Sequence, residues 1–452
     1  MGKEEFGIWL ILLSIVNLIR GINVGQTNYS SNLINLNYSK GDGSLLNKLV
    51  SYGHSANIIM VVFQIIIVIC ISIPFVLNGI TGISLSFIKN SNLSLSLLLL
   101  LIPTIIYQYA TLFLLRLFEP AGKIHISIKY SFLGELVDMI GTILFIFLFK
   151  SILGMSFGIF LFNSLYSIFL IWFVKRQVHF LNHDSFKFSL NKGLSQIVKS
   201  LLLTFSFIVE KINELGLNIV VGRLFLPINV PLFSASKTIT NIALKVSSAL
   251  VGPLMPSVQN NFATDNHQSN NQLIVKFWKF TSNILLLGVV GFYPIIPFLF
   301  EKWTLGKISY NGTLIVCFLM SILFQNFSSI LVECLRKLNL IKEITGYNLL
   351  KVGVIIALFI VGGILKDFNF VGYAILIAEV LSTLYLYFIR RSYFADASLS
   401  RVFKWRMLIN LIFSTLFIMY SFNLINYIYV IIGVIALVIV DFMKSKKNEN
   451  TI

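Results

Sequence analysis

Three polar residues at regular spacing interrupt an apolar stretch between residues 231 and 256. Lys237, Asn241 and Lys245 follow one another at intervals of four, so on an α-helix they share one face opposite an apolar back. A charged side chain at the centre of a membrane helix costs roughly 2.5 to 3.5 kcal/mol on insertion scales, so each ammonium group must face a partner, water or a ligand. The spacing therefore predicts a cationic wall that lines a cavity and receives an anion.

The preceding apolar stretch, residues 197–221, carries an acidic face at the same spacing. Glu210 and Glu214 are four residues apart, and a short connection joins this stretch to the lysines. Two interpretations stay open. The carboxylates neutralise Lys237 and Lys245 as contacts between helices, or they bind a coupling H⁺ or Na⁺ and leave the lysines to hold a diphosphate.

Arg20 marks the first apolar stretch, together with Asn17 and Ser14. A planar guanidinium suits phosphate oxygens, so one interpretation is a contact to the diphosphate of a lipid carrier. The predicted stretch ends about five residues after Arg20, which leaves a second interpretation open, namely that its side chain snorkels to the membrane surface.

Other acidic residues stand inside apolar stretches as well. Glu135 and Asp138 are one helical turn apart, and we expect them to form ionic contacts near the membrane surface beside Lys129. Glu379 stands alone in its stretch, with no role assigned.

The composition is that of an all-α integral membrane protein. Of 452 residues, 57% are hydrophobic and 12% are charged, and the mean hydropathy is +0.86; soluble domains have about 25% charged residues. Apolar stretches long enough to cross a bilayer recur along the chain. We expect about 13 transmembrane helices, near residues 7–25, 56–77, 95–118, 131–149, 154–174, 197–221, 231–256, 276–300, 312–335, 347–365, 369–389, 405–421 and 424–441.

Charge placement and missing motifs exclude several function classes. The formal net charge of +17 comes largely from Lys and Arg in short loops between spans, which membrane topology explains, so we do not expect a nucleic-acid partner. The sequence has no G-x-x-x-x-G-K-[ST] phosphate loop, no H-E-x-x-H motif and no G-x-S-x-G elbow. We therefore expect no ATP hydrolysis, no metal or other cofactor, and no enzymatic activity.

Loop charges and an internal repeat set the expected organisation. Basic residues gather in alternate loops and in the tail, so the positive-inside rule places the C-terminus in the cytoplasm. Spans recur at matching intervals in two halves, which predicts two pseudo-symmetric lobes. The expected divisions are an N-lobe of five spans (1–180), a C-lobe of six spans (181–390) and two extra spans with a cytoplasmic tail (391–452). Because 197–221 has no counterpart before residue 7, we expect that the first helix of the N-lobe is missing.

Two segments carry a family resemblance. Residues 2–27, GKEEFGIWLILLSIVNLIRGINVGQT, resemble the G-x-x-x-[YF]-G motif and second helix of bacterial polysaccharide flippases. These form the O-antigen (Wzx-type) branch of the multidrug/oligosaccharidyl-lipid/polysaccharide (MOP, MATE-like) exporter superfamily. Residues 228–262 are similar to the eighth helix of that family, with an aromatic-serine pair at its start and a proline near its cytoplasmic end.

This resemblance implies two six-helix lobes around a central cavity and alternating access in the bacterial cytoplasmic membrane. The implied substrate is an undecaprenyl-diphosphate-linked oligosaccharide, an O-antigen or capsule repeat unit, carried from the cytoplasmic to the periplasmic or outer leaflet. Polysaccharide polymerase and chain-length proteins are the implied partners, beside the lipid bilayer. The expected substrate-binding residues are Arg20, Lys237, Asn241 and Lys245, and the expected ion-coupling residues are Glu210 and Glu214.

Two other functions stay open. A cation-coupled multidrug exporter would share the fold, but it would rely on acidic residues for its cationic substrates, and the lysines inside the membrane speak against it. A membrane polysaccharide polymerase or ligase usually needs a sizeable external loop to hold its sugar acceptor, and the gaps on the external side of this chain are short.

Overall fold

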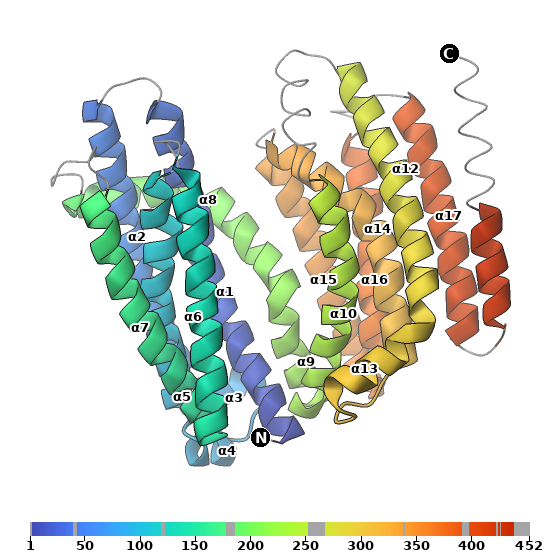
Figure 1. The fold of residues 1–452 in the computed structure, drawn as a ribbon, viewed down its shortest axis with the longest axis horizontal. Coiled ribbons are helices and arrows are strands. Elements are labelled where there is room, and N and C mark those ends of the chain that lie inside the picture. Colours follow the sequence, from blue (N-terminus) through green and yellow to red (C-terminus); the bar gives the residue numbers. More distant parts are fainter. Residues whose placement is uncertain are drawn as a thin grey trace. The chain divides into compact units, whose positions relative to one another are not determined.

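The computed structural model describes residues 2–38, 43–118, 123–177, 186–251, 267–337, 340–390, 397–421, 424 and 426–437, and these are nearly all helical (Figure 1). Eleven of the described helices are long and apolar enough to cross a membrane. Helix α10 (Val230–Val251) is not among them, because Lys237, Lys245 and other polar residues lower its hydropathy. The expected span at 424–441 is described as a shorter helix, Tyr427–Leu437. The chain therefore has the expected architecture of a multi-span membrane protein.

Two compact units make up the chain, Met1–Val230 and Pro231–Ile452. In the first unit, α1 packs against α2 and α8, and α7 packs against α5 and α6. The short helices α3 and α4 connect α2 to α5. The helices of this unit are α1 (Lys3–Tyr38), α2 (Gly43–Ile71), α3 (Pro74–Thr81), α4 (Leu85–Asn90), α5 (Leu93–Gln108), α6 (Ile124–Phe149), α7 (Ile152–Gln177), α8 (Leu190–Lys211) and α9 (Leu217–Phe225).

Non-α turns extend two of these helices. After α5 the chain continues through a π-helical stretch, Tyr109–Leu114, and a 3₁₀ turn, Leu115–Phe118. After α8 it continues through a second π-helical stretch, Ile212–Gly216, into α9. The π-helical stretches hydrogen-bond from residue i to i+5, so side chains on either side of them lose the four-residue spacing of an α-helix. Glu214 lies in the second of them.

The second unit is built around α14, whose membrane-length segment is 83% buried. Helices α12, α15, α16 and α17 all pack against it. The helices are α10 (Val230–Val251), α12 (His267–Phe292), α13 (Ile296–Thr304), α14 (Gly312–Lys337), α15 (Ile341–Leu365), α16 (Phe370–Arg390) and α17 (Ala397–Ser421).

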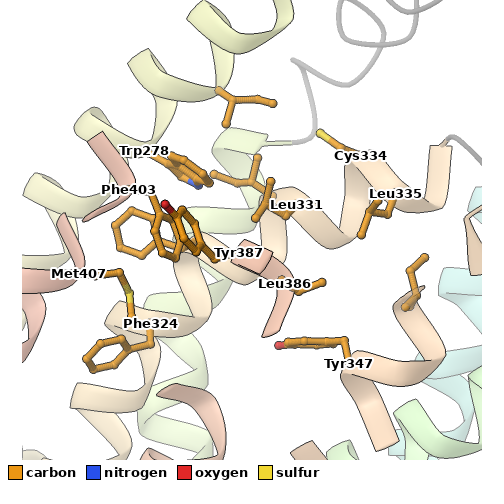
Figure 2. Close-up of a cluster of buried hydrophobic side chains, with 14 residues drawn as sticks. Trp278, Phe324, Leu331, Cys334, Leu335, Tyr347, Leu386, Tyr387, Phe403 and Met407 are labelled. Carbon is orange, nitrogen blue, oxygen red and sulfur yellow. The ribbon is translucent and has the colours of Figure 1, made fainter. Parts of the chain in front are cut away.

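An aromatic cluster joins four helices of the second unit (Figure 2). Tyr387 of α16 stacks on Phe403 of α17 with ring centroids 4.3 Å apart. Trp278 of α12 and Phe327 of α14 complete the contact, with centroids 5.4 Å apart. Aromatic pairs at such distances add about 0.5–1.5 kcal/mol beyond the area that they bury, so this cluster fixes α17 to the rest of the unit. Helix α17 therefore packs within the second unit, and the expected separate segment 391–452 stays a prediction.

The division between the units also differs from the predicted one at residues 180/181. Helix α8 packs against α1 and α2, so the stretch 197–221 belongs to the first unit and not to the second. The reason is a close helix contact: a Cβ atom at Gly25 of α1 would lie only 2.3 Å from the Cα atom of Thr204 in α8. With α8, the described part of the first unit has six membrane-length helices. The expectation that the first helix of the N-lobe is missing stays a prediction.

Candidate functional site

Arg20 lies near the middle of α1 and is partly buried. Its guanidinium carbon is 6.0 Å from the centroid of the Tyr107 ring in α5, within the range of a cation–π contact. The membrane-length part of α1 ends at Ser31, eleven residues or about 16 Å of helix further on. Both interpretations of Arg20, a contact to a diphosphate and snorkelling to the membrane surface, stay predictions.

Two glutamines hold the turn of α1 that carries Arg20. The side-chain amide of Gln64 in α2 donates a hydrogen bond to the Ile19 carbonyl at 2.6 Å, and that of Gln108 in α5 donates to the Arg20 carbonyl. Both glutamines are buried. Because buried amide groups need partners, these bonds fix the position of α1 against α2 and α5 at this depth.

Asp138 of α6 faces the same cluster. It interacts electrostatically with Arg20 and with Glu135, and the Asn163 amide of α7 donates a hydrogen bond to its Oδ1 at 3.2 Å. The predicted contact of Glu135 and Asp138 with Lys129 is wrong for Asp138; the Lys129 ammonium lies 5.9 Å from the centroid of the neighbouring Tyr130 ring. Helices α1, α5, α6 and α7 thus bring one guanidinium, two carboxylates and an amide together.

A glycine allows α5 to approach α6 closely at this cluster. A Cβ atom at Gly134 would lie 2.1 Å from the Tyr107 hydroxyl oxygen, a distance that no side chain tolerates. The Tyr107 ring therefore rests on the backbone of α6 one residue before Glu135. This contact sets the ring under the Arg20 guanidinium.

Helices α8 and α9 flank the other side of the Arg20 turn. The Asn218 amide donates a hydrogen bond to the Ser14 hydroxyl of α1 at 2.8 Å, and Lys211 packs its stem against Gly21. Lys211 forms a salt bridge with Glu214, in which both side chains are partly exposed. Lys211 and Asn218, in the stretch that carries the predicted acidic face, therefore contact α1.

The two predicted ion-coupling residues differ in burial: Glu210 is partly buried and Glu214 is exposed. The π-helical stretch Ile212–Gly216 lies between Glu210 and the end of this face, so the four-residue spacing does not hold there. The predicted contact between these carboxylates and Lys237 or Lys245 joins the two units and stays a prediction.

The lysine face of α10 is a regular helical face. Ser236 and Thr240 are buried beside it, and Phe233 is buried one turn before Lys237 on the same side. Lys237 and Asn241 are partly buried and Lys245 is exposed; the Lys237 ammonium lies 5.7 Å from the centroid of the Phe233 ring. The face lies at the surface of the helix that is less covered by protein, as a cavity wall requires. Its role in binding an anion stays a prediction.

The second unit contains a buried ion pair that the sequence analysis missed in part. Lys351 of α15 and Glu379 of α16 form a salt bridge and are 5% and 1% exposed. The hydroxyl groups of Ser328 and Tyr347 lie 3.1 Å from Glu379 Oε1 and donate to it. The signal for this site was present, because Tyr347 and Lys351 have the same four-residue spacing as the lysine face of α10. The sequence around Glu379 did not indicate that Lys351 is its partner.

Comparison with known proteins gives the fold. No model of a known protein family matches the sequence, and no curated protein does. Among solved structures, a multidrug resistance MATE family transporter of the MOP superfamily, in an inward-facing conformation, has a TM-score of 0.69 at 14% identity over 88% of this chain and 92% of its own. The lipid II flippase MurJ in an inward closed conformation has a TM-score of 0.69 at 16% identity over 99% and 94%.

A third solved structure is a MOP superfamily transporter from Pyrococcus furiosus, described as having a binding pocket of reversed polarity. Its TM-score is 0.60 at 13% identity over 87% of each chain. The chain has the fold of these transporters. Within this fold, the Arg20 cluster lies in the first unit and the Lys351–Glu379 pair in the second, and each is assembled from several helices.

Proposed function

We propose that the protein is a flippase that translocates an undecaprenyl-diphosphate-linked oligosaccharide from the cytoplasmic to the outer leaflet by alternating access. The observation that carries the proposal is Arg20, a partly exposed guanidinium near the middle of a membrane-length helix. A cation at such a position is costly unless it serves a ligand or a partner. Its planar donors match the oxygens of a diphosphate.

The surroundings of Arg20 support an exchangeable contact. Tyr107 offers a ring face at 6.0 Å, and Asp138 offers a carboxylate that Asn163 also holds. These contacts keep the guanidinium in place without enclosing it, because its side chain stays partly exposed. A diphosphate would bring more charge to Arg20 than either partner supplies, so the substrate can compete for it.

The lysine face of α10 is proposed as the second part of the anion site. Lys237 and Lys245 together carry two positive charges on one face, with Asn241 between them as a donor and acceptor. The fold supports a lipid-linked substrate, since the lipid II flippase MurJ shares it. In this proposal the protein acts in a bacterial cytoplasmic membrane with its C-terminus in the cytoplasm, beside polymerase and chain-length proteins, with H⁺ or Na⁺ as a coupling ion.

A cation-coupled multidrug exporter is the second candidate. One specific observation favours it: Glu210 is partly buried and Glu214 exposed on the α8–α9 helices, and such carboxylates attract cationic drugs. The multidrug MATE transporter shares the fold. Loss of the gene would then sensitise cells to cationic dyes and leave their surface polysaccharide unchanged.

The test replaces the cations one at a time in cells that lack the chromosomal copy of the gene. Arg20→Ala, Lys237→Ala and Lys245→Ala should each lower surface polysaccharide about tenfold or more, because a lost charge-assisted contact is worth roughly 1.5–3 kcal/mol. Lipid-linked precursor should accumulate on the cytoplasmic face at unchanged protein abundance. Lys342→Ala, an exposed lysine in the first turn of α15, is the matched control. Normal polysaccharide in the Arg20→Ala and Lys237→Ala/Lys245→Ala strains would refute the proposal.

A further inference from the structure

Glu379 occupies an unusual position in the second unit. Among the acidic side chains that the structure describes, it alone is buried, with 1% of its surface exposed. The other described acidic residues of this unit, Glu301, Glu333, Glu343 and Asp367, lie near the ends of their helices or in a turn. A buried carboxylate must be neutralised by a cation or a proton, because a lone charge in a low dielectric costs several kcal/mol.

Two oxygen atoms interact with the charge of Lys351. Its ammonium contacts Glu379 Oε2, and it also interacts with the Tyr347 hydroxyl. The Tyr347 hydroxyl lies 3.0 Å from Ser328 Oγ, and both hydroxyl groups reach Glu379 Oε1. Figure 2 shows Tyr347 reaching inward from α15 on the side of Leu386. The ammonium therefore contacts one carboxylate oxygen and one hydroxyl oxygen, and hydrogen bonds connect these groups to the Ser328 hydroxyl and to the second carboxylate oxygen.

Such a set of ligands is also the one that free alkali cations prefer. Hard cations bind carboxylate and hydroxyl oxygens, and the ammonium group is a compact point charge on a flexible stem. Three helices supply the four oxygens: α14 supplies Ser328, α15 supplies Tyr347 and α16 supplies Glu379. The site would keep its oxygens if the ammonium were removed.

We propose that Lys351 is a tethered cation: its ammonium occupies a monovalent-cation site formed by Glu379, Ser328 and Tyr347, so that the second unit needs no cation from solution. One consequence concerns coupling. Glu379 is then not available to a coupling H⁺ or Na⁺, whereas Asp138, Glu135, Glu210 and Glu214 of the first unit are partly or fully exposed. The assignment of Lys351 does not depend on the substrate of the protein.

The experiment measures the melting temperature of the purified full-length protein in NaCl and in choline chloride at equal ionic strength. Lys351→Ala removes the ammonium and leaves space, so its melting temperature should rise by several degrees with NaCl and then saturate, as binding to the folded state requires. The wild-type protein should not respond. Lys351→Met removes the same charge but fills the volume of the stem, so its response should be absent or much smaller.

Glu379→Gln in the Lys351→Ala background is the second control, and it should abolish the response because the carboxylate is gone. Three outcomes would overturn the proposal: a wild-type protein that NaCl stabilises, a Lys351→Ala protein that responds to pH but not to NaCl, or a response that survives in the double variant. The proposal also fails if the Lys351→Ala protein does not accumulate at any NaCl concentration while the Lys351→Ala/Glu379→Gln protein accumulates normally. In that case Na⁺ cannot replace the ammonium. This experiment measures melting temperature and not surface polysaccharide. Its result therefore does not depend on whether the flippase proposal holds.

Discussion

The two units hold their membrane-embedded charges in opposite ways. In the first unit the Arg20 guanidinium lies over a ring at 6.0 Å and near Asp138, and its side chain is partly exposed. In the second unit Lys351 touches Glu379 directly, and both side chains are buried. Both clusters contain a cation, a carboxylate and a tyrosine, so the difference lies in enclosure and not in composition.

Enclosure decides what a charge pair can do. A sealed pair has already exchanged its water for protein partners, and removing one member leaves the other without compensation. A partly exposed arginine keeps some of its hydration, so a stronger anion can take the place of its carboxylate at small cost. The Arg20 cluster is therefore suited to binding and the Lys351–Glu379 pair to charge balance. Glu379→Gln and Asp138→Asn test this contrast between the two charge clusters, and Gly25→Ala tests the packing of α1 against α8.

Glu379→Gln should have the largest effect on stability. It leaves the Lys351 ammonium buried without its carboxylate, and breaking a buried pair in this way costs about 3–5 kcal/mol. Thermal unfolding of the purified protein should show a large loss. Adding Lys351→Met should recover most of it, because the double variant buries no charge, and a double variant as unstable as Glu379→Gln would contradict the sealed-pair interpretation.

Gly25→Ala should come second. The new methyl group would lie 2.3 Å from the Cα atom of Thr204, and backbone atoms cannot move aside as a side chain can. Overpacking of this kind costs about 1–3 kcal/mol, and here it also separates α1 from α8. Gly79→Ala in α3 is the matched control, since nothing lies within 4 Å of its added Cβ. Equal melting temperatures for the two variants would show that the α1–α8 contact yields easily.

Asp138→Asn should have the smallest effect on stability, below about 1 kcal/mol, because the partner that it leaves is partly exposed. The amide can still accept from Asn163 through its oxygen. Without the carboxylate, Arg20 should bind a diphosphate more tightly, which titration of the purified protein with inorganic pyrophosphate would measure. Weaker binding, or a loss of stability close to that of Glu379→Gln, would remove the distinction between the two clusters.

The sequence predicts well what depends on one helix alone. The spans follow from apolar length, and the face shared by Lys237, Asn241 and Lys245 follows from helical spacing, which the structure confirms for α10. Helix α1 runs on to Tyr38, beyond the predicted span that ends near residue 25, through polar residues that an apolar pattern does not extend over.

Contacts between helices cannot be predicted from the spacing of residues in the sequence. The intervals of the internal repeat place 197–221 in the C-lobe, whereas α8 packs against α1 and α2, and its contact between Gly25 and Thr204 depends on tertiary packing. Asp138 and Asn163 belong to different helices, and no spacing relates them. Lys351 stands four residues after Tyr347, but its partner Glu379 lies on the next helix. These pairs follow only when the helices are placed side by side.

The contact at Gly25 has a mechanical consequence. With the backbones of α1 and α8 so close, the two helices cannot slide along each other without a collision of main-chain atoms. The guanidinium on α1 and the Lys211–Glu214 bridge that follows on from α8 are therefore held in one rigid piece, and any bending of this unit must occur at other helices.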